Sequence, residues 1–435
     1  MLNVVKTSRL SFKSNWKNAS LPMCAIVLLT PLVGAFPGVD NIELHAFGYL
    51  VPSQVVVVAV GTALLGAVHF VSPGKRVLGV RRVAAPVSML FCCMMLWGLA
   101  CALISGGSVQ RVLMQALWMV VPLMFAVSLV DLAKKRGVRF SELSEIVVVA
   151  VALFSCALIA YNFAAYGSTL ANGRLYCPGL GPVVLGYTNA LVIALALSRK
   201  GKDTFMPAPI LFFSVIVLLV STFLTGSRGG VYPALILSLI YFLPTKNAAA
   251  TMLVVLGAVI VLLLFNPVEA FLSGRAGSLQ SGRYATWDAA YAAFLDGSPL
   301  DKLFGYGLGN VFPYQDWYTS YYTGHIERGL TDGVWNSFSF RGNTMLVEPH
   351  NTYIWLLLEG GALSLVGYVA CLVSPLFSSN PSNMVLKLRF GAVLATFMVL
   401  GFFDAIVFVN MASAFWWGVL LIAFEASVES AGGSA

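Results

Sequence analysis

The stretch VLMQALWMVVPLMFAVSLV, residues 112–130, contains no charged side chain and decides the fold class of this chain. At 1.5 Å per residue, a helix of this length crosses the roughly 30 Å hydrocarbon core of a bilayer. Hydrophobic residues make up 59% of the whole sequence and charged residues only 10%. Soluble domains contain about 25% charged residues. We therefore predict an all-α polytopic membrane protein.

Similar apolar stretches follow one another along the sequence with short connections. They predict about twelve transmembrane helices in a single membrane domain that covers residues 1–435. The predicted spans are residues 21–38, 48–71, 83–105, 112–130, 146–166, 182–198, 207–224, 231–244, 250–270, 350–376, 389–408 and 411–426. One substantial loop, residues 271–349, lies outside these spans.

The distribution of Lys and Arg predicts the orientation in the membrane. If the N-terminus is cytoplasmic and the spans alternate, eighteen of the 26 Lys and Arg residues fall in cytoplasmic segments. Cytoplasmic loops of membrane proteins carry an excess of these residues. We therefore predict that both termini are cytoplasmic and that the loop 271–349 is on the opposite side.

Two stretches of the large loop have recognisable patterns. Residues 283–295 have helical apolar spacing, which predicts an amphipathic helix on the membrane surface or on the helix bundle. The stretch LFGYGLGN, residues 303–310, has glycine at alternate positions. Glycine tolerates unusual backbone conformations, so we predict a flexible turn whose backbone approaches a ligand closely.

The exterior cations are almost all arginine, whose planar guanidinium binds phosphate through two parallel hydrogen bonds. They therefore indicate a pyrophosphate site, or alternatively contacts with lipid headgroups. Arg228 lies in the tight turn TGSRGG, residues 225–230, where Ser227 and the glycine amides offer further donors. The other candidate phosphate-binding residues are Arg174, Arg275, Arg283 and Arg328.

The motif EPHN, residues 348–351, lies where the large loop meets a predicted span. A neutral imidazole at His350 can accept a proton from a sugar hydroxyl near neutral pH. Glu348 is placed to orient this imidazole, and Asn351 either caps the helix or binds a sugar. We include Tyr353 among the substrate-binding candidates and interpret Glu359 as structural. Alternatively, His350 is itself only a capping or interfacial residue.

Four motifs together resemble those of the O-antigen ligase and Wzy polymerase superfamily. They are LTGSRGG (224–230), SGRYATW (281–287), LFGYGLGN (303–310) and EPHNTYIWLLLEGG (348–361), in the order of the family. The resemblance implies a GT-C-like, inverting glycosyltransferase of the bacterial inner membrane that uses neither a metal nor a cofactor. Its donor would be a glycan on undecaprenyl pyrophosphate, and its active site would be periplasmic, on the same side of the membrane as the loop 271–349. His350 would activate the acceptor hydroxyl, while Arg228 and Arg283 would hold the pyrophosphate.

The acceptor separates two members of this superfamily. Polymerases extend another lipid-linked repeat unit, whereas ligases transfer the glycan to lipid A–core. The loop LFGYGLGN and Pro349 directly before His350 favour the polymerase, and the ligase is the alternative. Besides donor and acceptor, the resemblance implies membrane lipid and a chain-length regulator as partners, and no nucleic acid.

A transporter or flippase for a lipid-linked saccharide is a more distant alternative, and a purely structural membrane subunit is another. Transporters often contain repeated halves and have ionisable residues along a path through the membrane. The two halves of this sequence do not match. The predicted spans contain few charges, mainly Glu359 and Asp404. The seven cysteines have no metal-binding spacing.

Overall fold

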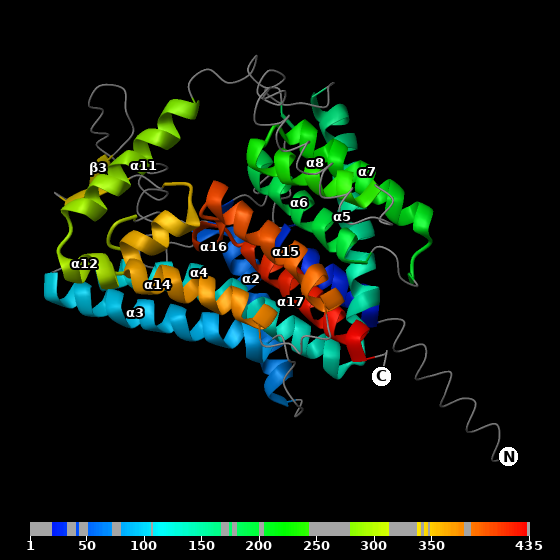
Figure 1. Cartoon of the computed structure of the whole chain (residues 1–435), viewed down its shortest axis with the longest axis horizontal. Coiled ribbons are helices and arrows are strands. Elements are labelled where there is room, and N and C mark those ends of the chain that lie inside the picture. The colour runs from blue at the N-terminus through cyan, green and yellow to red at the C-terminus, as the bar shows by residue number, and fades with distance from the viewer. Residues whose placement is uncertain are drawn as a thin grey trace.

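The computed structural model describes residues 20–32, 41–42, 51–71, 80–105, 108–166, 174–175, 181–199, 204–242, 279–312, 337–340, 343–346, 349–377 and 384–432. These residues are almost entirely helical, and most helices pack side by side in one bundle (Figure 1). Two short antiparallel hairpins accompany the helices, β1 (Asn41–Ile42) with β2 (Val51–Pro52), and β3 (Ser337–Phe340) with β4 (Asn343–Leu346).

The described helices of the first half of the chain lie between Ser20 and Phe242. After a helix over Ser20–Leu32 come α2 (Ser53–Val71), the short η2 (Val80–Ala84), α3 (Ala85–Ser105), α4 (Val109–Lys135), α5 (Phe140–Tyr166), α6 (Gly181–Arg199), α7 (Ala208–Thr225) and α8 (Arg228–Phe242). The second half contains α11 (Leu279–Asp296), α12 (Pro299–Phe304), α14 (Thr352–Phe377), α15 (Met384–Phe403), α16 (Ile406–Val409) and α17 (Ser413–Gly432).

Six helices among the described residues are long and apolar enough to cross a membrane. They are Val80–Ile104, Val109–Lys135, Phe140–Ala165, Gly181–Arg199, Ala208–Thr225 and Thr352–Phe377. Each coincides with a predicted span, and the all-α membrane class is confirmed. The predicted span 250–270 and most of the loop 271–349 lie outside the described residues, so the count of twelve spans stays a prediction.

One predicted span, 389–408, is interrupted in the structure. Helix α15 ends at Phe403, and the four-residue α16 follows only after Asp404 and Ala405. The Asp404 carboxylate accepts a hydrogen bond from the backbone N–H of Ala405 at 2.8 Å, a local bond that competes with the helical pattern. The irregular backbone is buried in the bundle, where Gln115 donates to the carbonyl of Phe408 at 2.8 Å. Non-helical backbone at membrane depth is tolerated when protein groups satisfy it in this way.

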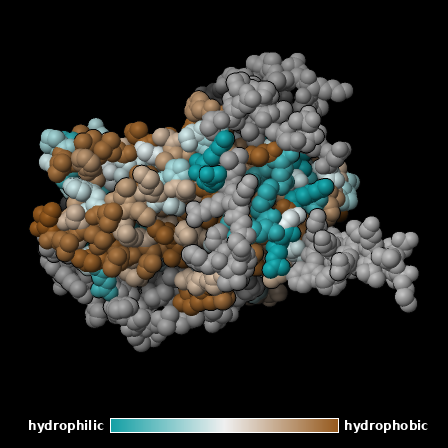
Figure 2. Space-filling model, turned by 90° about the horizontal axis from the view of Figure 1, so that it is seen from below, coloured by the Kyte–Doolittle hydropathy of each residue, from teal (hydrophilic) through white to brown (hydrophobic). Residues whose placement is uncertain are grey.

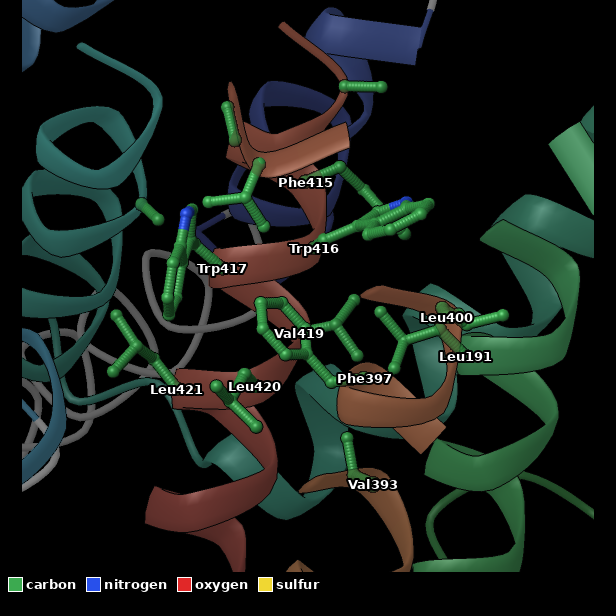
Figure 3. Close-up of a cluster of buried hydrophobic side chains, with 14 of the residues drawn as sticks. Leu191, Val393, Phe397, Leu400, Phe415, Trp416, Trp417, Val419, Leu420 and Leu421 are labelled. Atoms are coloured by element: carbon green, nitrogen blue, oxygen red, sulfur yellow. The ribbon is translucent and has the colours of Figure 1, made fainter. Parts of the chain in front are cut away.

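Helix α17 lies at the centre of the bundle and is buried along most of its length. Figure 3 shows Trp416 and Trp417 of α17 pointing to different sides of the helix, with Phe397 of α15 and Leu191 of α6 among the neighbouring buried side chains. The indole of Trp416 donates to the hydroxyl of Thr188 in α6 at 3.0 Å. Such hydrogen bonds between helices stabilise membrane bundles beyond side-chain packing alone.

The two ends of the bundle differ in composition. At the end near the C-terminus, Lys134–Glu429 at 3.8 Å joins α4 to α17 and Arg199–Glu145 at 3.4 Å joins α6 to α5, while Arg139–Glu142 at 3.1 Å is a local ion pair at the start of α5. The opposite end holds α11, α12 and the start of α14 (Figure 1). Segments predicted to lie on one side of the membrane therefore gather at one end. Figure 2 shows hydrophobic residues over much of the described surface near that opposite end.

Candidate functional site

His350 has an unusual backbone conformation directly before helix α14. It is the one non-glycine residue with positive φ, 48°, in the described part of the chain. This left-handed region costs a residue with a β-carbon about 1–2 kcal/mol. Asn351 caps the helix that follows, because its side-chain oxygen accepts the N–H groups of Tyr353 at 2.9 Å and Ile354 at 3.1 Å. The His350 side chain is 43% exposed, so the strained residue presents its imidazole outside the helix.

A carboxylate lies beside the His350 imidazole. The distance from His350 Nδ1 to Asp404 Oδ1 is 3.3 Å, and the Asp404 side chain is mostly buried. The hydroxyl of Thr352 donates to the backbone carbonyl of Asp404 at 2.9 Å and ties the two segments together. A carboxylate at Nδ1 favours the tautomer that carries its proton there, which makes Nε2 the basic nitrogen. The pair therefore has the geometry of an oriented general base.

The carboxylate predicted to orient His350 is a different one, Glu348, which lies outside the described residues. In the sequence, Asp404 is distinguished only as a charge within a predicted span. An ionisable residue inside a membrane span is itself a signal of function, because its burial is costly. That signal applies to both Asp404 and Glu359, the two main charges within the predicted spans, and does not by itself separate them.

The TGSRGG turn joins α7 to α8, and Arg228 is the first residue of α8. Arg228 is half-buried. The glycines that follow it allow close packing of helices. A β-carbon at Gly229 would lie 2.7 Å from the Tyr187 ring of α6 and 2.8 Å from the β-carbon of Phe403 in α15. Helix α8 therefore begins in direct contact with α6 and α15.

Ser227 does not present its hydroxyl to solvent in this conformation. Its side chain is buried next to Gly186 of α6, and among the described residues its oxygen has no hydrogen-bond partner. The prediction that Ser227 donates to a phosphate therefore requires the α6–α8 contact to open. Among the residues of this turn, Arg228 is the better placed to reach a ligand.

Arg174 lies beside the same turn. The backbone N–H of Leu175 donates to the carbonyl of Leu224 at 2.7 Å, which attaches residues 174–175 to the last turn of α7. Arg174 is half-buried there. Two of the predicted phosphate-binding arginines, Arg174 and Arg228, thus flank the α7–α8 connection, although they are 54 positions apart in sequence.

Helix α11 contains the SGRYATW motif and confirms the helix predicted over 283–295. It packs on the bundle through Trp287, whose indole donates to the carbonyl of Pro349 at 2.6 Å and whose ring meets Phe402 edge-on at 5.5 Å. Two locations were predicted for this helix, the membrane surface and the helix bundle. The face of α11 with Trp287 lies on the bundle. Arg283 belongs to the first half of α11, one helical turn before Trp287.

Three motifs that are far apart in sequence meet at the end of α15. Phe402 contacts Trp287 of α11, and the carbonyl of Phe403 accepts the hydroxyl of Tyr187 at 3.4 Å beside Gly229. Asp404 contacts His350. Residues 402–404 therefore connect the motif that contains Arg228, the helix that contains Arg283, and the histidine. Arg275 and Arg328, like Glu348, lie outside the described residues.

The LFGYGLGN loop does not have the role predicted for it. Gly305, Gly307 and Gly309 have positive φ of 78°, 93° and 75°, as the alternate glycines suggested. They approach protein rather than a ligand, because a β-carbon at Gly305 would lie 2.5 Å from the backbone of Glu359. The N–H of Tyr306 donates to the carbonyl of Leu358 at 2.8 Å. We therefore correct the prediction, since this loop is a structural attachment to α14.

Glu359 is the anchor of that loop and is fully buried. Its Oε1 accepts the backbone N–H groups of Val311 at 3.3 Å and Phe312 at 3.0 Å, and its Oε2 accepts the indole N–H of Trp355 at 2.6 Å. Three donors on one carboxylate compensate for part of the cost of its burial. The structure thus agrees with the structural interpretation of Glu359.

We expect Glu359→Gln to destabilise the protein by about 2 kcal/mol, because hydrogen bonds to a buried charged group contribute about 1.5–3 kcal/mol. The new amide NH₂ would face an N–H donor in either orientation of the amide, because both oxygens of Glu359 accept N–H groups. The thermal midpoint of the purified protein in detergent measures the effect. Glu142→Gln, at the exposed pair with Arg139, is the matched control and should shift the midpoint less. An unchanged midpoint for Glu359→Gln would contradict the anchoring role.

No protein-family model matches this chain, and no curated protein matches it. The likeness to the O-antigen ligase and Wzy polymerase superfamily rests on the four motifs themselves. Within the described residues, no group of three His, Cys, Asp or Glu side chains could hold a metal ion.

Proposed function

We propose that this membrane protein is a glycosyltransferase that moves a glycan from undecaprenyl pyrophosphate to a hydroxyl acceptor at the periplasmic face of a bacterial inner membrane. One observation carries the proposal. Residues 402–404 contact three motifs at once. Asp404 pairs with the strained, partly exposed His350, and the two residues before it contact the two arginine-bearing motifs. A general base and a set of phosphate ligands are the two things that such a transfer requires.

In the proposed reaction, His350 Nε2 removes the proton of the acceptor hydroxyl. The hydroxyl oxygen attacks the anomeric carbon from the side opposite the pyrophosphate, and the bond from that carbon to the phosphate oxygen breaks. The electron pair leaves with the pyrophosphate, whose growing negative charge is stabilised by Arg228 and Arg283, with Arg174 nearby. Asp404 stabilises the imidazolium that forms.

The acceptor is proposed to be a second lipid-linked repeat unit, which makes the protein a Wzy-type polymerase of a surface polysaccharide. The motif resemblance supports this choice over a ligase. Purified protein supplied with a lipid-linked repeat unit should produce a ladder of lipid-linked oligomers. Transfer to lipid A–core and no ladder would show the ligase reaction instead.

Asp404→Asn is expected to lower turnover by about 10²-fold or more, because an amide cannot stabilise the imidazolium and favours the wrong tautomer. Substrate binding should change little, since Asp404 does not contact the glycan in this mechanism. Initial rates over a range of donor concentrations separate the two effects. Asp404→Glu, which keeps the charge, should restore part of the activity. A variant Asp404→Asn with the wild-type turnover would contradict the role of Asp404.

A further inference from the structure

The corner formed by the end of α11 and by α12 exposes large apolar side chains. Leu300 is 55% exposed and Leu303 is 43% exposed, and Phe304 is also exposed. Tyr291 and Leu295 are exposed on the last turns of α11. Helix α12 is well formed, because Ser298 and Asp301 make a capping box at its start. Contiguous exposed apolar surface of this kind on an ordered element marks an interaction site.

This corner continues the exposed apolar face of α3. Met89, Leu96 and Leu103 recur every seven residues on α3 and are all strongly exposed, so they form one stripe along a membrane helix. The stripe ends at Leu103 and Ile104, and α12 lies beside this end of α3 (Figure 1).

Direct contacts fix α12 against α3. The ring of Phe304 packs on Trp97 at 5.5 Å, and the indole of Trp97 donates to the carbonyl of Gly305 at 3.0 Å. Trp97 directly follows Leu96, a residue of the exposed stripe, in the sequence. The apolar face of α12 thus extends the surface that α3 exposes along the membrane.

The bundle already occupies the other face of α11. Trp287 packs on Phe402, Ala290 is buried, and the hydroxyl of Tyr306 donates to the carbonyl of Ala293 at 2.7 Å. The side of α11 with Tyr291 and Leu295 remains exposed. The corner is therefore held rigidly in place while its apolar side chains face outward.

We propose that the α11–α12 corner inserts into the boundary between headgroups and acyl chains of the adjacent membrane leaflet, with phospholipid as its partner. Tryptophan and tyrosine favour this depth, and Trp97 and Tyr291 both lie at the corner. Surface helices bury apolar side chains about 5–10 Å into this region. This inference goes beyond the proposed function and does not depend on it. Its consequence is that α11, which contacts Pro349 beside His350, is held at the level of the membrane surface.

Site-specific photocrosslinking tests the insertion. A benzophenone amino acid is placed at position 300 or 303 of the full-length protein, which is reconstituted in phosphatidylethanolamine–phosphatidylglycerol vesicles with a tagged phospholipid. Position 103 on α3 is the positive control, and position 139, a largely exposed arginine at the opposite end of the bundle, is the aqueous control. All variants should elute as the wild-type peak in size-exclusion chromatography.

We expect lipid adducts at 300 and 303 that approach the yield at 103 and exceed the yield at 139 several-fold. Adducts at 103 but none at 300 and 303 would overturn the proposal. A second crosslinking experiment in native membranes addresses a different occupant. If positions 300 and 303 crosslink to one discrete polypeptide rather than to lipid, the surface is a protein interface and the proposal is wrong.

Discussion

His350→Ala and His350→Gly are both expected to lower glycan transfer by about 10²- to 10⁴-fold, the range of general-base catalysis. The two variants should differ in stability. At the positive φ of 48°, alanine retains the strain of a β-carbon, whereas glycine does not. We therefore expect the glycine variant to be more stable than the alanine variant by about 1 kcal/mol. Transfer assays and thermal midpoints of the two purified variants measure the two effects separately.

This pair of variants separates chemistry from backbone conformation. If His350 acts only by shaping the start of α14, the glycine variant should recover activity together with stability. Equal inactivity at different stabilities supports the imidazole as the base. Near-wild-type transfer by either variant would contradict the assignment of His350.

Arg228→Lys is expected to lower transfer by about 10²-fold, although the positive charge is kept. A lysine ammonium is a compact point charge and cannot reproduce the two parallel hydrogen bonds of a guanidinium to phosphate. Loss of one donor to the developing charge of a transition state costs about 10²- to 10³-fold in turnover. Turnover and donor affinity, measured on the same preparation, show whether the loss falls on the transition state.

Arg139→Lys is the matched control for this substitution. Arg139 lies at the opposite end of the bundle, is largely exposed and pairs with Glu142. Exposed ion pairs contribute little to stability, so this variant should retain wild-type transfer. If Arg228→Lys is as active as Arg139→Lys, Arg228 does not bind the pyrophosphate through a bidentate contact.

The fold class could be predicted from the sequence because local hydropathy identifies membrane spans. Local hydropathy does not identify the interruptions within a span. Hydropathy alone joined residues 389–408 into one helix, whereas the side chain of Asp404 ends α15 by a hydrogen bond to the next residue. Such a bond depends on the conformation of one side chain, and hydropathy averaged over twenty residues does not reveal it.

The site was predictable only where its geometry is local. The cap at Asn351 involves residues two and three positions away, and the pattern around it indicated the start of α14. The partner of His350 is 54 positions away, so no local pattern distinguishes Asp404 from Glu348. The alternate glycines of LFGYGLGN correctly indicated a close approach. They did not reveal that the approach is to Glu359, because the fold alone brings α14 to that loop.

The central claim is that this protein forms glycosidic bonds with His350 as the base. The most direct measurement supplies a lipid-linked repeat unit to proteoliposomes and records the newly bonded glycan and the released undecaprenyl pyrophosphate together. We predict one released carrier for each new bond with the wild-type protein, and neither product with the His350→Gly variant. Movement of the intact lipid-linked saccharide across the vesicle membrane, with no new bond formed, would contradict the account.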